Sequence, residues 1–452
     1  KTIRSAFDIA RSGRPGPVVI DVPKDVQQHF GTFHGEGLLQ FRGFDLRKEK
    51  RANTIMTKAT GDAFFDMLKQ SKRPLVYAGG GIIMSDASEE LRKFLKKYKL
   101  PVVTTLMGIS SVDTTEDLSM HMLGMHGTAY ANYAVEDCDF LIAIGARFDD
   151  RVAGKVQEFA PNARNIAHID LDSAEIGKVK AVTWSHNADA KRSLKELLKF
   201  GKDVKTSLAP WHKHLKALKA KHCLNFNRTS PLIQPAEVLE EMNKLTKGKA
   251  IVSTGVGQHQ MFAAQYIDYT KPRQWLTSGS MGTMGFGLPA AIGAQFACPD
   301  AMVIDVDGDG SIRMNIGELE TMTTYGVNVK VLLLNNTCDG MVRQWQNMMY
   351  EERYSGTDKA LHKKDFVLSA KADGFEFSER VDDRKDLKRI MKAFINFKGP
   401  AFLEVMTDID AMIFPMVGPG KGYKEMQTGP FIVEREPEEA IEVSGTGDTA
   451  MF

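Results

Sequence analysis

The sequence predicts an α/β protein with two doubly wound parallel-sheet domains. Short apolar runs that resemble strands alternate with amphipathic stretches such as SEELRKFLKKY (88–98), as in parallel sheets joined by helices. The alternation occurs twice, over residues 54–200 and 232–413, so we expect two sheets covered by helices on both faces. The strands expected in the first part are PLVYAGG (74–80), PVVTTL (101–106), FLIAIGA (140–146) and NIAHIDLD (165–172). Those expected in the second part are AIVSTG (250–255), AMVIDVDGDG (301–310), VKVLLLNN (329–336) and AFLEVM (401–406).

Composition favours small-molecule chemistry over binding to polymers or membranes. The chain has 452 residues and a net charge of +2, so it has no strong field to attract nucleic acid or an anionic membrane. No apolar run is long enough to cross a bilayer. The four cysteines form no Cys-x-x-Cys pair, which argues against a disulfide framework and a structural zinc site and favours a reducing compartment.

The segments outside the two domains read as connectors and as part of a further domain. Residues 1–30 resemble the last helix and the last strand, PGPVVIDVP (15–23), of an α/β domain whose earlier part precedes Lys1. We expect linkers at 31–53 and 201–231, and a C-terminal lid and tail at 414–452. Because the chain starts inside a helix–strand unit without a methionine, a targeting peptide cannot be observed.

Two polar clusters follow predicted strands of the second domain. AMVIDVDGDGS ends in Asp309, Gly310 and Ser311, and VKVLLLNN ends in Asn335 and Asn336. The carboxyl ends of parallel strands meet at one edge of the sheet, and the stretch between the clusters is long enough for a crossover helix. The glycines admit a phosphate close to the backbone, while Asp309 and Asn336 supply the oxygens that magnesium prefers.

Two other interpretations of this motif remain open. Asp305, Asp307 and Asp309 also match the first half of a calcium-binding EF-hand loop, but its twelfth position holds Ile316 instead of glutamate, and a strand pattern precedes it. The Asp and Gly residues could also serve turn chemistry alone.

Gly-Asp-Gly followed by Asn-Asn at this distance resembles the signature of thiamine-diphosphate enzymes. A narrower resemblance, to acetohydroxyacid synthase large subunits, runs almost end to end. It is carried by LGMHGTAYANYAV (123–135), GARFDDRVAGK (145–155), VGQHQMFAAQ (256–265), QWLTSGSMGTMGFGLPAAIGAQ (274–295), GMVRQWQ (340–346) and FPMVGPG (414–420). The resemblance implies thiamine diphosphate, Mg²⁺ and FAD as cofactors, with residues 1–30 ending a pyrimidine-binding domain.

The resemblance also implies site residues. The magnesium ligands would be Asp309, Asn336 and the backbone carbonyl of Cys338. Gly310 and Ser311 would lie beside the diphosphate, and Met314 would hold the cofactor in its bent conformation. The remaining thiamine-diphosphate contacts would be Gln258, His259, Gly282, Thr283, Met284 and Met341, with Gln258 also counted among the catalytic residues.

Two features of the sequence favour a flavin site independently of the resemblance. One is a glycine-rich turn, and the other is an acidic residue at the end of a strand. Gly79, Gly80 and Gly81 end a strand and precede a helix, and Asp170 ends a strand where it could bind a ribose. The resemblance adds Leu123, Gly124, Met125, His126, Gly145, Ala146, Arg147, Phe148, Asp149, Leu171 and Asp189. The chain departs from the family at Ala188, where a glycine is usual.

The implied activity is decarboxylation of pyruvate and transfer of its two-carbon unit to pyruvate or 2-oxobutanoate. Arg151 would bind the carboxylate of the second keto acid, and Trp345 would favour 2-oxobutanoate. The family's catalytic glutamate has no match after Lys1, so we expect this 452-residue chain alone to be inactive. The alternatives are a flavin-redox enzyme resembling pyruvate oxidase and a non-catalytic cofactor-binding protein.

The resemblance further implies a homodimer or homotetramer and a small regulatory subunit. We expect a location in the bacterial cytoplasm, or in a plastid or mitochondrion if the source is eukaryotic.

Overall fold

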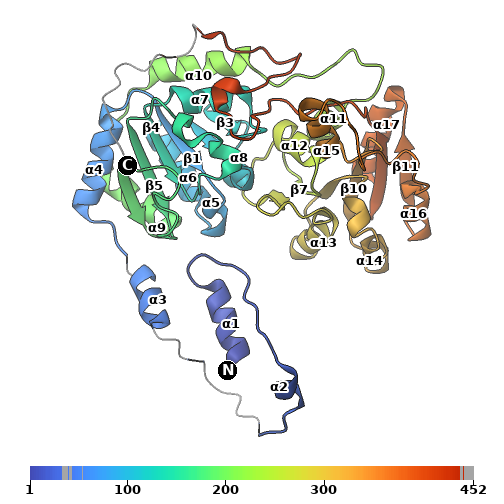
Figure 1. Ribbon diagram of the computed structural model, residues 1–452, viewed down its shortest axis with the longest axis horizontal. Helices are drawn as coiled ribbons and strands as arrows, with labels where there is room; N and C mark the ends of the chain where they lie inside the picture. Colours follow the sequence, from blue (N-terminus) through green and yellow to red (C-terminus); the bar gives the residue numbers. More distant parts are fainter. Residues whose placement is uncertain (33–38, 40–42, 53, 438–440, 442–452) are drawn as a thin grey trace.

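The chain folds into two parallel β-sheets, each with six strands among the residues that the structure describes (Figure 1). The computed structural model describes residues 1–32, 39, 43–52, 54–437 and 441. All the strand pairs of both sheets are parallel, which confirms the predicted fold class. None of the helices in these residues has the length and apolarity needed to cross a membrane.

Sheet A, in the middle unit, has the strand order β3-β2-β1-β4-β5-β6. Its strands are β1 (Pro74–Ala78), β2 (Val102–Thr104), β3 (Ser119–Met122), β4 (Phe140–Ile144), β5 (Asn165–Asp170) and β6 (Trp184–Asn187). The accompanying helices are α4 (Lys58–Gln70), α5 (Gly81–Met84), α6 (Ser88–Tyr98), α7 (Ala129–Asp137), α8 (Asp150–Ala153) and α9 (Ala190–Phe200), with 3₁₀ turns η1 (Leu106–Ser111) and η2 (Val156–Glu158). Side chains of Thr57, Thr128 and Asp189 accept backbone hydrogen bonds at the starts of α4, α7 and α9, which fixes where these helices begin.

Sheet B, in the C-terminal unit, has the order β11-β12-β10-β9-β7-β8. Its strands are β7 (Ile251–Thr254), β8 (Trp275–Thr277), β9 (Val303–Gly308), β10 (Val329–Asn335), β11 (Phe377–Val381) and β12 (Ala401–Met406). The accompanying helices are α11 (Pro235–Thr246), α12 (Gln258–Tyr266), α13 (Gly287–Ala297), α14 (Glu318–Thr324), α15 (Gly340–Met349), α16 (Phe366–Ala372) and α17 (Arg384–Asn396), with 3₁₀ turns η3 (Ile312–Met314) and η4 (Tyr423–Glu425).

The continuous apolar runs of the central strands reflect burial on both faces of the sheet. In β10, Val331 and Leu333 pack in one core cluster, while Leu332 and Leu334 pack in another on the opposite face. The eight predicted strands all form. The strands that the sequence analysis missed, β3, β6, β8 and β11, lie at the four sheet edges and have mixed sequences such as SMHM and FSERV.

The order of strands places a crevice in each sheet at the carboxyl ends. The chain runs outward from β1 to β3 and then returns to β4, so the direction of winding reverses between β1 and β4. In sheet B it reverses between β7 and β9. Open α/β sheets bind ligands at such reversal points, and both points are followed by the glycine-containing turns that the sequence singles out.

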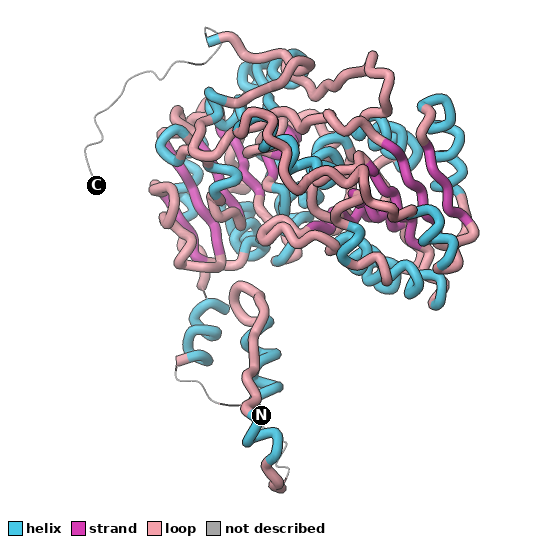
Figure 2. The backbone as a smooth tube through the Cα atoms, turned by 45° about the vertical axis from the view of Figure 1, so that its right-hand side comes forward, coloured by secondary structure: helices cyan, strands magenta, loops and turns pink. Residues whose placement is uncertain are grey.

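The predicted strand at residues 15–23 is wrong. This stretch is extended, but it joins neither sheet, and Val19 is 91% exposed. A strand needs a neighbour for its backbone hydrogen bonds, and both described sheets end in other strands. The predicted helix does form, as α1 (Thr2–Arg11); with α2 (Lys24–Gln28) and α3 (Phe44–Ala52) it lies outside the two-sheet body (Figures 1 and 2).

Two helices occupy segments that we expected to be linkers. Helix α3 lies within 31–53, of which residues 33–38, 40–42 and 53 fall outside the described residues. Helix α10 (Ala209–Lys221) lies within 201–231 and packs on α7, burying Trp211, Leu215 and Leu218 in the core of the middle unit. Its apolar residues are spaced at helical intervals among basic ones, a pattern that the net basicity of the segment obscured.

The described part of the expected lid and tail packs on the middle unit. Tyr423 donates a hydrogen bond from its hydroxyl to the carbonyl of Val152 (2.6 Å), and Met426 and Ile432 join the same core cluster. Arg435 pairs with Asp137 of α7 at 2.7 Å. Residues 414–437 therefore return across the middle unit, whereas 438–440 and 442–452 lie outside the described residues.

We predict that Leu215→Ala lowers the free energy of unfolding by about 2–4 kcal/mol, because it leaves a cavity beneath α10. Lys213→Ala, on the exposed side of the same helix, is the matched control and should change it by less than about 0.5 kcal/mol. Urea unfolding measures both. Equal stability of the two variants would show that α10 contributes little to the core.

Candidate active site

A large cavity lies between the carboxyl ends of the two sheets. Its volume is about 1480 Å³, larger than most small-molecule pockets. Gly80, Gly145 and Asp170 border it from the middle unit, while Gly282, Met341 and Trp345 border it from the C-terminal unit. Such a volume suits a ligand of dinucleotide size together with a small substrate.

Several buried polar atoms on the cavity wall have no hydrogen-bond partner within the described part of the chain. They are the hydroxyl oxygens of Tyr77 and Thr105, Nε2 of His126 and Nε1 of Trp275. Burial lowers the pKa of His126 to about 4, so its ring is neutral at pH 7. Unpaired buried polar groups are rare in folded proteins, and here they indicate a ligand with several polar groups.

Glycines are required where the turn after β1 packs against the turn after β4 in the middle unit. A Cβ on Gly79 would overlap the carbonyl oxygen of Gly145, and a Cβ on Gly81 would overlap the Gly145 backbone. The turns after β1 and β4 can therefore touch only because these positions lack side chains. Gly80 and Gly81 then present backbone to the cavity, whereas Gly79 lies behind them.

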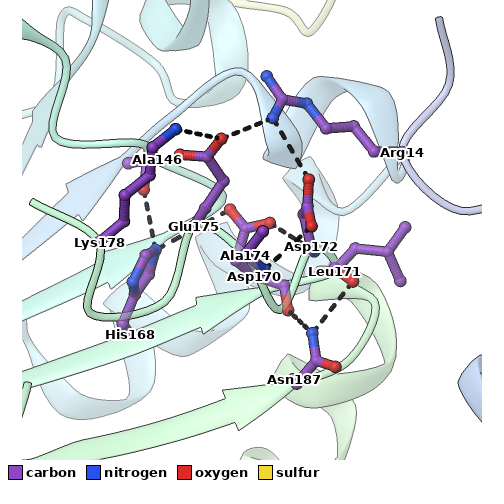
Figure 3. A network of polar contacts seen from close by, with 10 residues as sticks. All are labelled: Arg14, Ala146, His168, Asp170, Leu171, Asp172, Ala174, Glu175, Lys178 and Asn187. Atoms are coloured by element: carbon purple, nitrogen blue, oxygen red, sulfur yellow. Dashed lines mark hydrogen bonds and ion pairs between the residues drawn. The ribbon is translucent and has the colours of Figure 1, made fainter.

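A polar network fixes the turn after β5 (Figure 3). One Asp170 carboxylate oxygen accepts from the backbone N–H of Asp172 at 2.8 Å, and Asn187 donates to the carbonyls of Asp170 (2.9 Å) and Leu171 (3.0 Å). Burial raises the pKa of Asp170. The network holds Asp170 and Leu171 against the cavity, where a ribose hydroxyl could donate to the carboxylate.

The N-terminal segment reaches the same network. Arg14 lies 3.0 Å from Glu175 and 3.5 Å from Asp172 (Figure 3). Arg11, Gly13 and Pro15 also border the cavity. Nothing in the local sequence pattern of this segment had indicated that role.

Two arginines follow β4 on the cavity wall. Arg147 forms a 2.7 Å ion pair with Asp149, which fixes its direction. The side chain of Arg151 is 62% exposed, its ion pair with Asp150 is long (4.0 Å), and it borders the cavity. A guanidinium group in this position can bind a carboxylate through two hydrogen bonds.

Three loops of the C-terminal unit meet at Ser311. Its hydroxyl oxygen accepts from the backbone N–H of Val256 (3.1 Å) and of Gly285 (3.0 Å). This joins the loops after β7, β8 and β9 into one cradle beside Gly310. His259 is buried in the same place, with Nε2 3.4 Å from Asp307, and burial lowers its pKa to about 3.

The three expected magnesium ligands converge. The side-chain oxygen of Asn336 lies 2.9 Å from the carbonyl oxygen of Cys338 and 3.2 Å from one carboxylate oxygen of Asp309. Adjacent ligands of an octahedral Mg²⁺ at 2.1 Å would lie about 3.0 Å apart. An Asn336 oxygen at this separation from two further oxygens fits a hard divalent cation, and the N–H of Cys338 donates to the same Asn336 oxygen at 3.3 Å.

The surroundings of Asp309 are short of positive charge. Burial raises the pKa of its carboxyl to about 7, and Lys359 and Arg313 offset this only in part. The Lys359 ammonium is 2.5 Å from Asp339, which takes up much of its charge. A bound cation would supply the charge that the carboxylate needs.

The side chain of Asn335 has a different role from that of Asn336. Its amide donates to Glu404 of β12 at 2.6 Å, and its side-chain oxygen accepts from the N–H of Thr337 at 2.9 Å. The first asparagine of the pair therefore shapes the turn, and the second presents an oxygen to the cation position.

The predicted site residues divide into three groups by position. The cavity is bordered by Gly80, Gly81, Leu123, Met125, His126, Gly145, Ala146, Arg147, Asp149, Arg151, Asp170, Leu171, Asp189, Gly282, Met341 and Trp345. The cradle and cation position hold Gln258, His259, Thr283, Met284, Asp309, Gly310, Ser311, Met314, Asn336 and Cys338. Gly79, Gly124 and Phe148 lie outside the cavity wall, Phe148 in the aromatic core with Tyr77 and Phe159.

Comparison with protein families matches both units. Residues 62–197 match the central domain of thiamine pyrophosphate enzymes, and residues 255–405 match their C-terminal TPP binding domain. The acetolactate synthase large subunit of Parasynechococcus marenigrum is 43% identical over 427 residues, covering 94% of this chain and 68% of the relative. The chain belongs to the acetolactate synthase family of thiamine pyrophosphate enzymes.

Other members of the acetolactate synthase family are equally similar. The chloroplastic acetolactate synthase 1 of Nicotiana tabacum is 43% identical over 95% of this chain and 64% of its own length. The mitochondrial acetolactate synthase of Schizosaccharomyces pombe is 41% identical over 93% of this chain and 65% of its own length. The chain thus spans a little under two thirds of these relatives.

Sequence reasoning missed several cavity residues of this family member. Leu106 and Met107 follow β2, and Ser278 and Gly279 follow β8. Their positions directly after strands could have indicated that they border a site, but strand β8 was not predicted. Gln260 was also missed, although it belongs to the VGQHQ segment; its amide donates to Thr277 at 2.7 Å.

We predict that Asp309→Asn weakens Mn²⁺ binding at least tenfold, because it removes the one formal charge among the three ligands. Without metal the variant should be as stable as the starting protein, since a neutral amide replaces a buried carboxylate. Isothermal titration and thermal unfolding measure the two effects. Asp300→Asn, at an exposed position, is the control, and equal Mn²⁺ affinity in both variants would contradict the assignment.

Proposed function

We propose that the protein to which this chain belongs is an acetolactate synthase that decarboxylates pyruvate and transfers the two-carbon unit to pyruvate or 2-oxobutanoate. The products are 2-acetolactate and 2-aceto-2-hydroxybutanoate, at the start of branched-chain amino acid synthesis. One observation supports this proposal: Val256 borders the arginine-bearing cavity, and its N–H donates to Ser311 of the cradle, so the cavity and the cradle adjoin. A carboligase needs both a diphosphate anchor and room for a second keto acid.

The cofactors of this reaction are thiamine diphosphate, Mg²⁺ and FAD. Thiamine diphosphate, when bound, would supply an acidic thiazolium carbon as the nucleophile for a keto group and a cationic ring able to take up the electron pair released on decarboxylation. Asp309, Asn336 and the carbonyl of Cys338 would hold the cation, and the cradle around Ser311 would hold the diphosphate. The unpaired polar atoms of the cavity wall support FAD there.

Three side chains carry the proposed handling of substrate and cofactor. Arg151 binds the carboxylate of the second keto acid, and Trp345 on α15 packs against its side chain. Met314, 58% exposed at the end of η3, supports the bent cofactor through its apolar bulk.

We further propose that the protein forms a homodimer or homotetramer and binds a small regulatory subunit. The relative from P. marenigrum is named a large subunit, which supports a smaller partner. The names of the relatives include chloroplastic and mitochondrial forms, so the expected bacterial cytoplasm stays one proposal among these locations.

The activity is tested by supplying the holoenzyme with pyruvate, with and without 2-oxobutanoate, and identifying the products. Acetolactate and acetohydroxybutyrate formed without oxygen consumption support the proposal. Pyruvate-dependent reduction of oxygen or a quinone in excess of acetolactate would instead favour a flavin-redox enzyme. Cofactor binding without either reaction would favour the non-catalytic alternative.

We predict that Trp345→Leu in the full-length protein lowers the ratio of acetohydroxybutyrate to acetolactate about tenfold in a competition assay, because the larger substrate loses an aromatic contact. Trp345→Phe keeps an aromatic ring and should lower the ratio less. An unchanged ratio in the leucine variant would remove Trp345 from the specificity site.

A further inference from the structure

A chain of three side-chain amides runs from the cation position into the core of the C-terminal unit. The Asn336 nitrogen donates to Gln258 Oε1 at 3.3 Å, and Gln258 Nε2 donates to Gln344 Oε1 at 3.0 Å. Gln344 lies on α15 and is 2% exposed, and Gln258 is 7% exposed. Asn336 and Gln258 therefore each point the side-chain nitrogen toward the next side-chain amide and the oxygen toward the cation position.

Backbone groups at the far end of the chain fix this direction. Gln344 Oε1 also accepts from the N–H of Ile413 (2.9 Å), and its nitrogen donates to the carbonyl of Ile413 (3.0 Å). Gln258 Nε2 donates to the carbonyl of Ala411 (2.9 Å). Backbone N–H and C=O groups cannot exchange places, so only one orientation of Gln344 and Gln258 satisfies all of them.

The last amide of the chain has two reasonable orientations. Rotating the Asn336 amide by 180° would place its nitrogen 2.9 Å from Cys338 O and 3.2 Å from the Asp309 carboxylate, which are good hydrogen bonds. The rotation would also place its oxygen 3.3 Å from Gln258 Oε1, so that two acceptors would face each other. The N–H of Cys338 also donates to the Asn336 side-chain oxygen, at 3.3 Å, so this bond and the amide chain together keep the Asn336 nitrogen away from the ligand oxygens.

We propose that Gln344 is a positioning residue for the cation site, acting through Gln258 to keep the side-chain oxygen of Asn336 directed at the cation. The inference rests on the proposed magnesium site and extends it to a residue that makes no contact with the metal. Gly340, the first residue of α15, supports it, because a Cβ there would overlap both Gln258 Oε1 and Asn336 Nδ2. The helix start thus leaves room for the amides to meet.

The same chain couples the cation to the segment that follows β12. Binding that fixes Asn336 also fixes Gln258 and Gln344, and hence the hydrogen bonds to Ala411 and Ile413. Coupling of two equilibria is reciprocal, so docking of this segment and cation binding strengthen each other.

The test compares Mn²⁺ affinity in Gln344→Met with that in Gln295→Met. Gln295 is the matched control, a buried glutamine of α13 that donates to the carbonyls of Cys298, Pro299 and Ala301. Both variants lose a buried amide, but we expect only Gln344→Met to weaken Mn²⁺ binding, about tenfold. Affinity within twofold of the starting protein would overturn the proposal. Absence of Mn²⁺ binding by the starting protein would overturn the metal site as well.

Repeating the Gln344 substitution in an Asn336→Asp variant separates the effect of the Asn336 amide orientation from other effects. In Asn336→Asp, the carboxylate presents an oxygen to the cation whichever way it turns. Adding Gln344→Met to this background should therefore lower Mn²⁺ affinity less than twofold. A further tenfold loss there would show that Gln344 acts by some other route, and would overturn the proposal.

A measurement on the unsubstituted protein avoids any folding defect of the variants. Saturating Mg²⁺ should slow hydrogen exchange at the Ile413 amide at least threefold, while the amides of residues 295–298 should be unaffected. Equal exchange at Ile413 with and without Mg²⁺ would contradict the coupling.

Discussion

Convergence of three oxygen atoms at the ends of β9 and β10 is the constraint on which the site depends. The side-chain oxygen of Asn336 lies at about the separation of adjacent magnesium ligands from both the Asp309 carboxylate and the carbonyl oxygen of Cys338. Bringing acceptors together in a buried place costs free energy unless a positive charge lies between them. The local structure imposes this arrangement through the Asn335–Glu404 hydrogen bond, the glycine at position 340 and the amide chain.

The arrangement of the two sheets places the proposed cation position next to the cavity. Each sheet reverses its winding next to a strand that ends in a glycine-containing turn, and both sets of carboxyl ends open toward the cavity. The C-terminal unit carries the proposed cation and diphosphate position, while the middle unit contributes Arg151, Asp170 and unpaired polar atoms to the cavity wall. Family membership and geometry thus support the same proposed reaction from independent directions.

The sequence predicted those features whose cause is local. The eight central strands were recognisable because burial on both faces requires continuous apolar runs, and Asp309 and Asn336 because a strand and a turn define them. The edge strands, helix α10 and the failed strand at 15–23 depend on what each segment packs against. The role of Gln344 could not be predicted for the same reason, because its partners Gln258 and Ile413 are distant in the sequence.

We infer that these three oxygens form the cation site of a thiamine-diphosphate enzyme. A crystal structure with Mn²⁺ and thiamine diphosphate, read by the anomalous scattering of manganese, tests it most directly. We expect one strong peak about 2.1–2.2 Å from the Asp309 carboxylate, the Asn336 side-chain oxygen and the carbonyl oxygen of Cys338. A peak elsewhere, or Asn336 with its nitrogen turned toward Asp309, would contradict it.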